Sequence, residues 1–275
     1  MRFWKYHGIG NDFVLLENFD GGANKDPAWV TAICDRRFGI GADGILYLER
    51  SQKADATMSI LNSDGSVAEM CGNGIRCVAK HLHDYGLVKE RDMTIETLAG
   101  VKTIECTVTG EQVTDVKVGM GGAVLECAKV PMRCPGKFID SVLEVGGAKI
   151  RGTAVSMGNP HFITFQDFTD AEQERLAPLI QSDESFPRKT NVEFVKSSNG
   201  VLTVKVLERG AGWTMACGTG ACATAVAAAL QGLAPYEREI EVRLPGGSLW
   251  IAVSKDLGSV TMRGPAARVF QGEIV

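Results

Sequence analysis

The sequence predicts an α/β (α+β) protein of two pseudo-symmetric domains, each with mostly antiparallel strands wrapped around a central helix. Three observations predict this fold: an internal repeat, many short runs typical of strands among few helical segments, and a glycine-rich helix start that occurs once in each half. The chain has 275 residues, which is enough for two domains with a core each.

The repeat is visible as paired landmarks at nearly constant spacing. One motif, CGNGIRC, begins at Cys71, and its counterpart CGTGAC begins at Cys217, 146 positions later (217 − 71). Glycines and asparagines before and after these motifs keep almost the same offset; the pairs are Asn11 and Asn159, Gly86 and Gly232, and Gly100 and Gly246. We therefore predict one domain from residues 1–118 plus a C-terminal segment 264–275, and a second from 119–263.

The expected elements follow the same order in both halves. An extended segment comes first, then a helix, then strands, then a helix of about twelve residues after each cysteine, and finally a hairpin. The segments are 13–18 and 162–166, 27–38 and 170–181, 57–62 against 192–196 with 202–207, and 93–108 and 239–253. The helices after the cysteines should end at Gly86 and Gly232, because glycine readily adopts the left-handed conformation that follows a helix.

These two helices differ from surface helices. Ile75, Val78, Leu82 and Tyr85 form an apolar stripe, and 220–230 is alanine-rich and apolar nearly all round, which is typical of a buried helix. We expect each helix to point its N-terminus at the other half, so that both cysteines line a cleft between the domains.

Composition excludes several classes of function. The chain has 29 basic and 33 acidic residues, a formal charge of −4, so we expect no nucleic-acid or membrane partner. Residues 1–13 lack the apolar region of a signal peptide, and the longest nearly apolar run, 221–230, is about half of the ~20 residues that span a membrane. These features predict a cytoplasmic protein.

Eight cysteines are expected to be reduced, because the chain is long and has no export signal. Their spacings do not fit a structural zinc site. Six of them are interpreted as small buried hydrophobic residues: Cys34, Cys77, Cys106, Cys127, Cys134 and Cys222.

Cys71 and Cys217 have a different setting. A helix N-terminus stabilises a thiolate, and its free N–H groups bind carboxylates. Two such sites facing each other would place a carboxylate between helix ends and its α-carbon between two thiols, an arrangement that suits racemisation or epimerisation. Pyridoxal phosphate bound to a lysine is the usual electron sink for such a reaction, but the sequence shows no convincing site for it, so we predict no cofactor, and no metal. A dinucleotide-binding motif is not supported either, because Cys77 and Ala223 stand where it needs its third glycine.

Six stretches resemble the diaminopimelate epimerase family along nearly the whole chain. They are HGIGNDFV (7–14), FGIGADG (38–44), NSDGSVAEMCGNGIRC (62–77), SMGNPH (156–161), TNVEF (190–194) and ERGAGWTMACGTGACA (208–223). The resemblance implies two similar α/β domains with the active site between them. It also implies cofactor-independent interconversion of LL- and meso-diaminopimelate through two cysteines, in lysine and cell-wall precursor biosynthesis.

The resemblance also implies roles for individual residues. Cys217 would be the proton acceptor and Cys71 the proton donor when the L centre is inverted, with His161 and Glu208 tuning the thiols. Gly72-Asn73 and Gly218-Thr219 would hold the reacting carboxylate. The remaining substrate contacts would come from Asn11, Asn62, Asn159, Asn191, Glu208 and Arg209.

Each of the polar residues also has a structural interpretation. Asn62 and Asn159 stand in turn-like sequences, and Glu208-Arg209 could be a solvated pair after a strand. His161 could be a core histidine with its hydrogen bonds satisfied.

Two positions depart from the family pattern. Gly44 stands where some members have a glutamine that contacts substrate, so we make no prediction about a side-chain contact there. Phe270 stands where some members have a tyrosine linked to dimer formation, and we expect a homodimer.

Other functions remain open at this point. Proline and hydroxyproline racemases also use paired cysteines, but their substrates lack the second amino-acid end that Glu208-Arg209 would recognise. Relatives that catalyse other isomerisations lack the paired cysteines. A non-catalytic binding or metal-binding protein is the alternative from another class.

Overall fold

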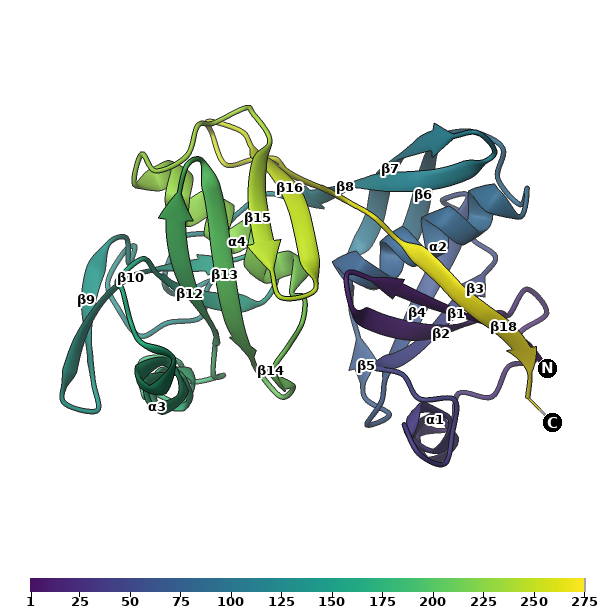
Figure 1. Cartoon of the computed structure of the whole chain (residues 1–275), viewed down its shortest axis with the longest axis horizontal. Coiled ribbons are helices and arrows are strands. Elements are labelled where there is room, and N and C mark those ends of the chain that lie inside the picture. Colours follow the sequence, from purple (N-terminus) through teal and green to yellow (C-terminus); the bar gives the residue numbers. More distant parts are fainter. Residues whose placement is uncertain (275) are drawn as a thin grey trace. The chain divides into compact units, whose positions relative to one another are not determined.

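The computed structural model describes residues 1–274, and the chain forms two compact units. The first unit contains Met1–Gly119 and the chain from Arg263 onward, and the second contains Met120–Met262. Each unit mixes strands with two helices (Figure 1), so the predicted α/β class is confirmed.

Strand pairing in the first unit runs in the order β18, β1, β2, β3, β4, β6, β7, β8, and the short β5 pairs with β4. The pairs β2–β3 and β4–β6 are parallel and the others are antiparallel. The bounds are β1 Arg2–Gly8, β2 Asn11–Glu17, β3 Gly44–Glu49, β4 Ala56–Asn62, β5 Val67–Ala68, β6 Asp92–Thr97, β7 Gly100–Thr109, β8 Gln112–Gly121 and β18 Ala267–Glu273.

Strand pairing in the second unit runs in the order β9, β10, β11, β12, β13, β15, β16, and the short β14 pairs with β13. Here β11–β12 and β13–β15 are the parallel pairs. The bounds are β9 Ser141–Val145, β10 Ala148–Ser156, β11 Pro160–Thr164, β12 Asn191–Ser198, β13 Val201–Glu208, β14 Gly212–Trp213, β15 Ile240–Leu244, β16 Gly247–Val253 and β17 Val260–Gly264.

The two units therefore share one topology. Strands β1, β2, β3, β4, β6 and β7 correspond to β10, β11, β12, β13, β15 and β16, and each neighbouring pair has the same direction in both units. The short strands β5 and β14 are also equivalent. β5 pairs antiparallel with β4, and β14 pairs antiparallel with β13, which is the strand equivalent to β4. The predicted internal duplication is confirmed.

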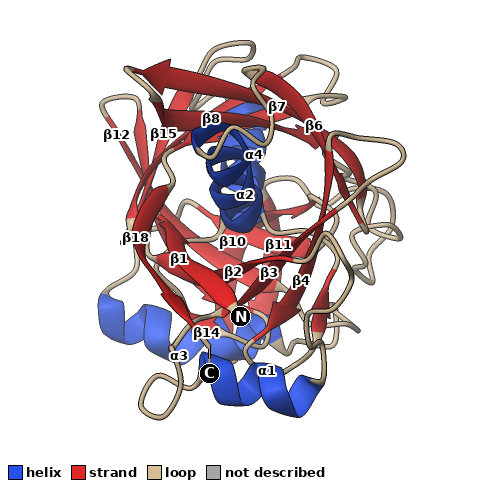
Figure 2. Ribbon diagram, turned by 90° about the vertical axis from the view of Figure 1, so that its right-hand side faces the viewer, coloured by secondary structure: helices blue, strands red, loops and turns tan. Residues whose placement is uncertain are grey.

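A buried helix lies inside the strands of each unit, as Figure 2 shows. Helix α2 (Gly72–Asp84) contacts β1, β2, β3, β6 and β7, and helix α4 (Gly218–Leu230) contacts β10 to β13, β15 and β16. Eleven of the thirteen residues of α4 are buried, because its alanines let the surrounding strands approach on every side. The prediction of strands wrapped around a central helix is confirmed.

The other two helices, α1 (Pro27–Cys34) and α3 (Asp170–Gln181), are partly exposed. The prediction placed the end of the first at residue 38. It ends at Cys34 because Asp35 adopts an extended backbone, and its carboxylate accepts hydrogen bonds from the N–H groups of Arg37 and Phe38. None of the helices among the described residues is long and apolar enough to cross a membrane.

Several strands were absent from the expected elements, β3 among them. Its sequence, GILYLE, is buried at five successive positions, because the side chains of β3 are covered on both faces. Such a strand lacks the alternation of apolar and polar residues that identifies a half-buried strand.

One expectation about the cysteines was wrong. Cys127 and Cys134 were expected to be reduced, but they form a disulfide, with Cα atoms 5.8 Å apart. The backbone accounts for their proximity, since the N–H groups of Val130 and Met132 both bond to the Cys127 carbonyl and turn the chain back. Cys34, Cys77, Cys106 and Cys222 are buried and form no disulfide, as predicted.

Helix α3 begins with a capping box, and this gives a test of local stability. The Thr169 hydroxyl accepts from the Glu172 N–H, while the Glu172 carboxylate accepts from the Thr169 N–H. Thr169→Ala should lower the free energy of unfolding by ~1 kcal/mol, measured by urea denaturation. Thr31→Ala, an exposed position within α1, is the control and should leave stability unchanged or slightly higher. Equal effects of the two substitutions would contradict this account.

Candidate functional site

Both singled-out cysteines are N-cap residues of the buried helices. Cys71 precedes α2, and its sulfur accepts from the Gly74 N–H at 3.4 Å. Cys217 precedes α4, and its sulfur accepts from the Gly220 N–H at 3.3 Å. The free N–H groups of both helix starts are thus directed toward a thiol and toward any anion bound beside it.

In the first unit, two asparagines lie beside Cys71. The thiol donates to Asn11 Oδ1 at 3.6 Å, and Asn73 Nδ2 donates to the same oxygen at 3.1 Å. Asn11 ends the tight turn from β1 into β2, and Asn73 is in the first turn of α2. The structure therefore brings together three of the predicted site residues of this unit.

Cys217 in the second unit is more deeply buried, with 4% of its surface exposed. Its sulfur lies 3.6 Å from Thr219 Oγ1. Burial raises the pKa of the Cys217 thiol well above its ordinary value, and the carboxylates of Glu208 and Glu193 raise it further. The hydrogen bonds from Thr219 and Gly220 act in the opposite direction but do not compensate. Cys217 is consequently a neutral thiol at neutral pH.

This raised pKa predicts the pH dependence of thiol reactivity. The folded chain holds the Cys217 proton to a higher pH than the unfolded chain, whose thiol titrates near 9.0. Alkylation of Cys217 by iodoacetamide, followed by peptide mass mapping, should stay slow up to pH 9 and accelerate above it. The same cysteine in urea is the control and should reach its half-maximal rate near 9.0. A half-maximal rate at or below that pH in the folded protein would contradict the prediction.

The raised pKa of Cys217 also determines how this thiol affects the free energy of unfolding as the pH changes. Above pH 9 the unfolded chain releases this proton before the folded chain does, so the contribution of Cys217 to stability falls as the pH rises.

His161 lies in a buried polar cluster of the second unit. Its Nδ1 lies 2.6 Å from Glu193 Oε1, its Nε2 lies 3.0 Å from Asn159 Oδ1, and the side chains of His161 and Glu193 are both fully buried. A carboxylate at Nδ1 requires a proton there and fixes the orientation of the ring. Burial raises the pKa of the Glu193 carboxyl, and His161 opposes that shift.

Glu193 was not among the residues predicted from the sequence. It lies against the start of α4, since a Cβ on Gly220 would lie 2.7 Å from Glu193 Oε1. The sequence did contain a signal for Glu193, since it is a glutamate within the apolar strand β12. A charged side chain is buried at such a position only when it has a partner.

Glu208 and Arg209 stand at and just after the end of β13. The Glu208 carboxylate accepts from Thr214 Oγ1 at 2.5 Å. The Arg209 side chain is exposed and donates to the Arg188 carbonyl at 3.0 Å. The Asn191 amide holds the Arg209 backbone, because its Oδ1 accepts from the Arg209 N–H at 2.8 Å, while its Nδ2 donates to the Pro160 carbonyl. Asn191 therefore positions its neighbours with both ends of its amide.

The predicted contact Asn62 ends β4, and Gly44, which departs from the family pattern, begins β3. Asn62 bonds within its own turn, where its Nδ2 donates to Ser66 Oγ at 3.0 Å. Gly44 has no room for a side chain in this backbone arrangement, because a Cβ there would lie 2.6 Å from the Leu61 carbonyl oxygen. The structural interpretation thus accounts for the hydrogen bonds of Asn62.

The predicted residues divide between the units. The first holds Asn11, Asn62, Cys71, Gly72 and Asn73, and the second holds Asn159, His161, Asn191, Glu208, Arg209, Cys217, Gly218 and Thr219. Within residues 1–274, no group of three or more His, Cys, Asp or Glu side chains is placed to hold a metal ion.

Comparison with known proteins agrees with the motifs. The family model described as diaminopimelate epimerase matches residues 3–126 and 153–269. A protein of that name from Desulfitobacterium hafniense is 48% identical over 281 residues, which covers 100% of this chain and 98% of the relative. Another, from Desulforudis audaxviator, is 48% identical over 279 residues, with 100% and 99% coverage.

Solved structures share the fold at low sequence identity. A hydroxyproline epimerase from Agrobacterium vitis has a TM-score of 0.71 at 14% identity and covers 100% of this chain and 90% of its own. A phenazine biosynthesis protein from Bacillus anthracis has a TM-score of 0.72 at 17% identity, with 100% and 99% coverage. A hydroxyproline epimerase and a phenazine biosynthesis protein therefore share this fold.

Proposed function

The chain belongs to the diaminopimelate epimerase family, and we propose that it inverts one α-carbon of LL-2,6-diaminopimelate to give the meso form with Cys71 and Cys217 as the proton-transferring groups. The observation that carries this proposal is the equivalence of the two cysteines. Each is the N-cap of the central helix in one copy of a duplicated fold, with a glycine N–H on its sulfur.

The reaction needs the two thiols on opposite faces of one carbon. We propose that the domains formed by 1–118 with 264–275 and by 119–263 enclose a cleft, with the N-termini of α2 and α4 directed into it. In the L-to-D direction, the Cys217 thiolate removes the α-proton, and the Cys71 thiol delivers a proton to the other face. The reacting carboxylate accumulates negative charge, which the N–H groups around Gly72-Asn73 and Gly218-Thr219 stabilise.

The raised pKa of Cys217 fits this sequence of events. A buried neutral thiol costs little in the free enzyme, whereas a buried thiolate needs a compensating positive charge. The α-ammonium group of the substrate supplies that charge when it binds, and the Cys217 proton passes to solvent as the thiolate forms. Glu208, whose carboxylate raises the Cys217 pKa, and His161, held by Glu193, are the proposed groups that tune the thiols.

The distal end of the substrate has its own ammonium and carboxylate. Arg209 is the proposed partner of the distal carboxylate, because a planar guanidinium pairs with a carboxylate through two hydrogen bonds. Glu208, Asn11, Asn62, Asn159 and Asn191 are the proposed polar contacts. For Asn191 the hydrogen bonds already made favour a role through the position of Arg209.

No cofactor enters this mechanism, since two thiols and two helix ends supply the proton transfers and the charge stabilisation. The product serves lysine and cell-wall precursor synthesis, and we propose a cytoplasmic location for the enzyme.

The decisive experiment is incubation of the purified protein with LL-diaminopimelate in D₂O. We expect meso product with one deuterium at the inverted α-carbon and none at the other. Absence of meso product under conditions where a characterised family member is active would refute the proposal. Faster inversion of proline or hydroxyproline than of diaminopimelate would favour the racemase alternative.

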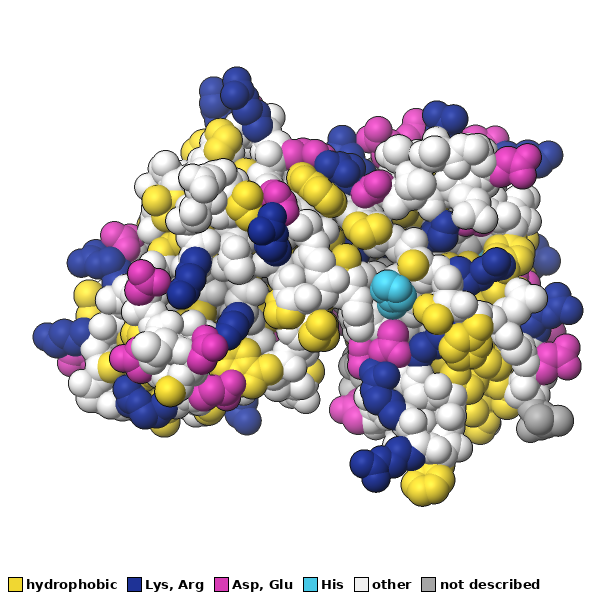
Figure 3. Space-filling view, viewed as in Figure 1, with side chains coloured by type: hydrophobic (Ala, Val, Ile, Leu, Met, Phe, Trp, Pro, Cys, Tyr) yellow, Lys and Arg dark blue, Asp and Glu magenta, His cyan; other side chains and the backbone are white. Residues whose placement is uncertain are grey.

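We also propose a homodimer. On the face seen in Figure 3, apolar side chains gather over β18, where Val269 and Phe270 are 57% and 46% exposed. Phe270→Asp should shift the sedimentation coefficient from dimer to monomer, because a charge at an apolar interface must be desolvated. Leu98→Asp, an equally apolar exposed position in the β6–β7 turn, is the control and should leave the dimer intact. A monomeric wild-type protein at micromolar concentration would contradict the proposal.

A further inference from the structure

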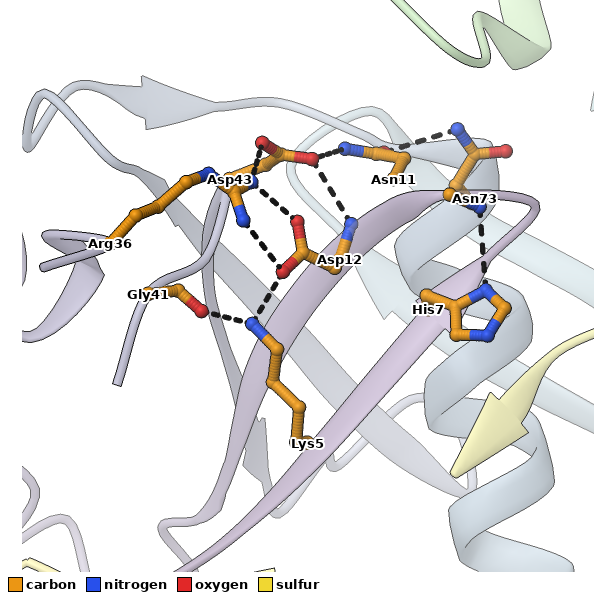
Figure 4. Close-up of polar contacts among 9 residues, drawn as sticks. Lys5, His7, Asn11, Asp12, Arg36, Gly41, Asp43 and Asn73 are labelled. Carbon is orange, nitrogen blue, oxygen red and sulfur yellow. Dashed lines mark hydrogen bonds and ion pairs between the residues drawn. The ribbon is translucent and has the colours of Figure 1, made fainter. Parts of the chain in front are cut away.

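Asn11 in the first unit is hydrogen-bonded to a network of charged side chains formed by Lys5, Asp12, Arg36 and Asp43 (Figure 4). Asp43 Oδ2 accepts from Asn11 Nδ2 at 2.7 Å and from the Asp12 N–H at 3.0 Å, and Asp43 Oδ1 accepts from Arg36 Nη2 at 2.7 Å. Both oxygens of this carboxylate are thus occupied by donors. Asp43 is not among the proposed catalytic or substrate-binding residues.

The network holds the Asp43 carboxylate in place. Arg36 also pairs with Asp12 at 2.7 Å, and the buried Lys5 ammonium pairs with Asp12 from the other side and donates to the Gly41 carbonyl. Burial alone would raise the pKa of Asp12, but the hydrogen bonds from Arg36 and Lys5 outweigh it and lower that pKa. Two cations therefore balance two carboxylates, and the loop 36–43 is tied to the start of β2.

The contact with Asp43 determines which end of the Asn11 amide meets the thiol. A carboxylate only accepts hydrogen bonds, so the NH₂ end of Asn11 must face Asp43. The carbonyl end then faces Cys71, whose S–H donates to it at 3.6 Å, and Asn73 Nδ2 donates to the same oxygen. With the amide reversed, two donors would meet at Asn73, and the thiol would face an NH₂ group.

We propose that Asp43 is a positioning residue of the active site, which fixes the Asn11 amide so that its carbonyl oxygen holds the Cys71 thiol in the protonated, proton-donating form. The inference rests on the proposed function for its catalytic meaning, but the contact between Asp43 and Cys71 through Asn11 is testable without turnover. Asp43→Asn is the informative substitution, because an amide has one acceptor and cannot serve both Asn11 and Arg36.

The test is a double-mutant cycle read by alkylation of Cys71, with iodoacetamide as the probe and peptide mass mapping as the measurement. At pH 8, Asp43→Asn should accelerate alkylation about fivefold, the effect of losing one hydrogen bond to the thiol. Asn11→Ala should accelerate it by the same factor. Adding Asp43→Asn to Asn11→Ala should change nothing more, because Asp43 acts through Asn11. Asp20→Asn, an exposed carboxylate that accepts from the local Gly22 N–H, is the matched control and should match the wild type.

Two outcomes would overturn the proposal. One is an unchanged alkylation rate in Asp43→Asn. The other is a further acceleration by Asp43→Asn in the Asn11→Ala background, which would mean that the charge acts directly on the sulfur. If Asp43→Asn lacks a cooperative unfolding transition, Asp43→Ser, which keeps one acceptor, takes its place in the same cycle. Epimerisation of diaminopimelate by the wild type is measured separately, so failure of the activity and failure of the positioning role are distinguishable.

Discussion

Replacing either Cys71 or Cys217 with alanine should lower kcat/KM for epimerisation of LL-diaminopimelate by ~10³-fold or more. A positioned acid or base contributes roughly 10²–10⁴-fold, and in the proposed mechanism each thiol serves one face of the α-carbon. Both positions are helix N-caps, so the fold should survive at a cost of about 1 kcal/mol in unfolding free energy, measured by urea denaturation.

The two variants should also differ in a partial reaction. Cys71→Ala keeps the Cys217 base, so it should exchange the α-proton of the LL isomer with D₂O without inverting it. Cys217→Ala should lose that exchange. Matched controls are Cys77→Ala and Cys222→Ala, which remove a buried thiol one or two turns further along each helix. They should cost ~1–2 kcal/mol of stability and leave turnover nearly unchanged. Near-normal turnover in Cys71→Ala or Cys217→Ala would rule out the two-thiol mechanism.

The duplicated fold could be predicted because its signals are local. Glycines that end helices and open turns stand at fixed offsets from each cysteine, and the alanine-rich α4 is apolar on every side. Strands such as β3 could not, because a strand buried on both faces lacks alternation and looks like any short apolar run. The Cys127–Cys134 disulfide was missed since the turn that brings the two residues together is set by backbone hydrogen bonds of a loop.

The candidate site, like the fold, could be predicted from the sequence only in part. The cysteines and their glycines are recognisable from sequence, since the chemistry needs those residue types next to one another. Asp43 and Glu193 were missed because their hydrogen-bond partners, Asn11 and His161, are 32 positions away along the chain in both cases (43 − 11 and 193 − 161). Strand pairing creates those contacts: the parallel pair β2–β3 brings the Asp43 loop to Asn11, and the parallel pair β11–β12 brings Glu193 to His161. Spacing along one sequence carries no record of such partners.

Arg209→Met should lower kcat/KM for diaminopimelate by about 10- to 100-fold, mostly through KM. Hydrogen bonds to a charged group contribute ~1.5–3 kcal/mol, and a contact at the distal end is made equally in the ground state and the transition state. The exposed guanidinium is bonded only to the Arg188 carbonyl among its side-chain contacts in the described residues, so it is available to a ligand. Arg209→Lys should recover part of the loss, because an ammonium keeps the charge but lacks the planar fork.

Arg188→Met is the matched control. The backbone carbonyl of residue 188, which accepts from Arg209, remains in this variant, so kcat/KM should stay within about threefold of the wild type. Steady-state kinetics with LL-diaminopimelate decide the matter, and an Arg209→Met enzyme as efficient as Arg188→Met would remove Arg209 from the distal site.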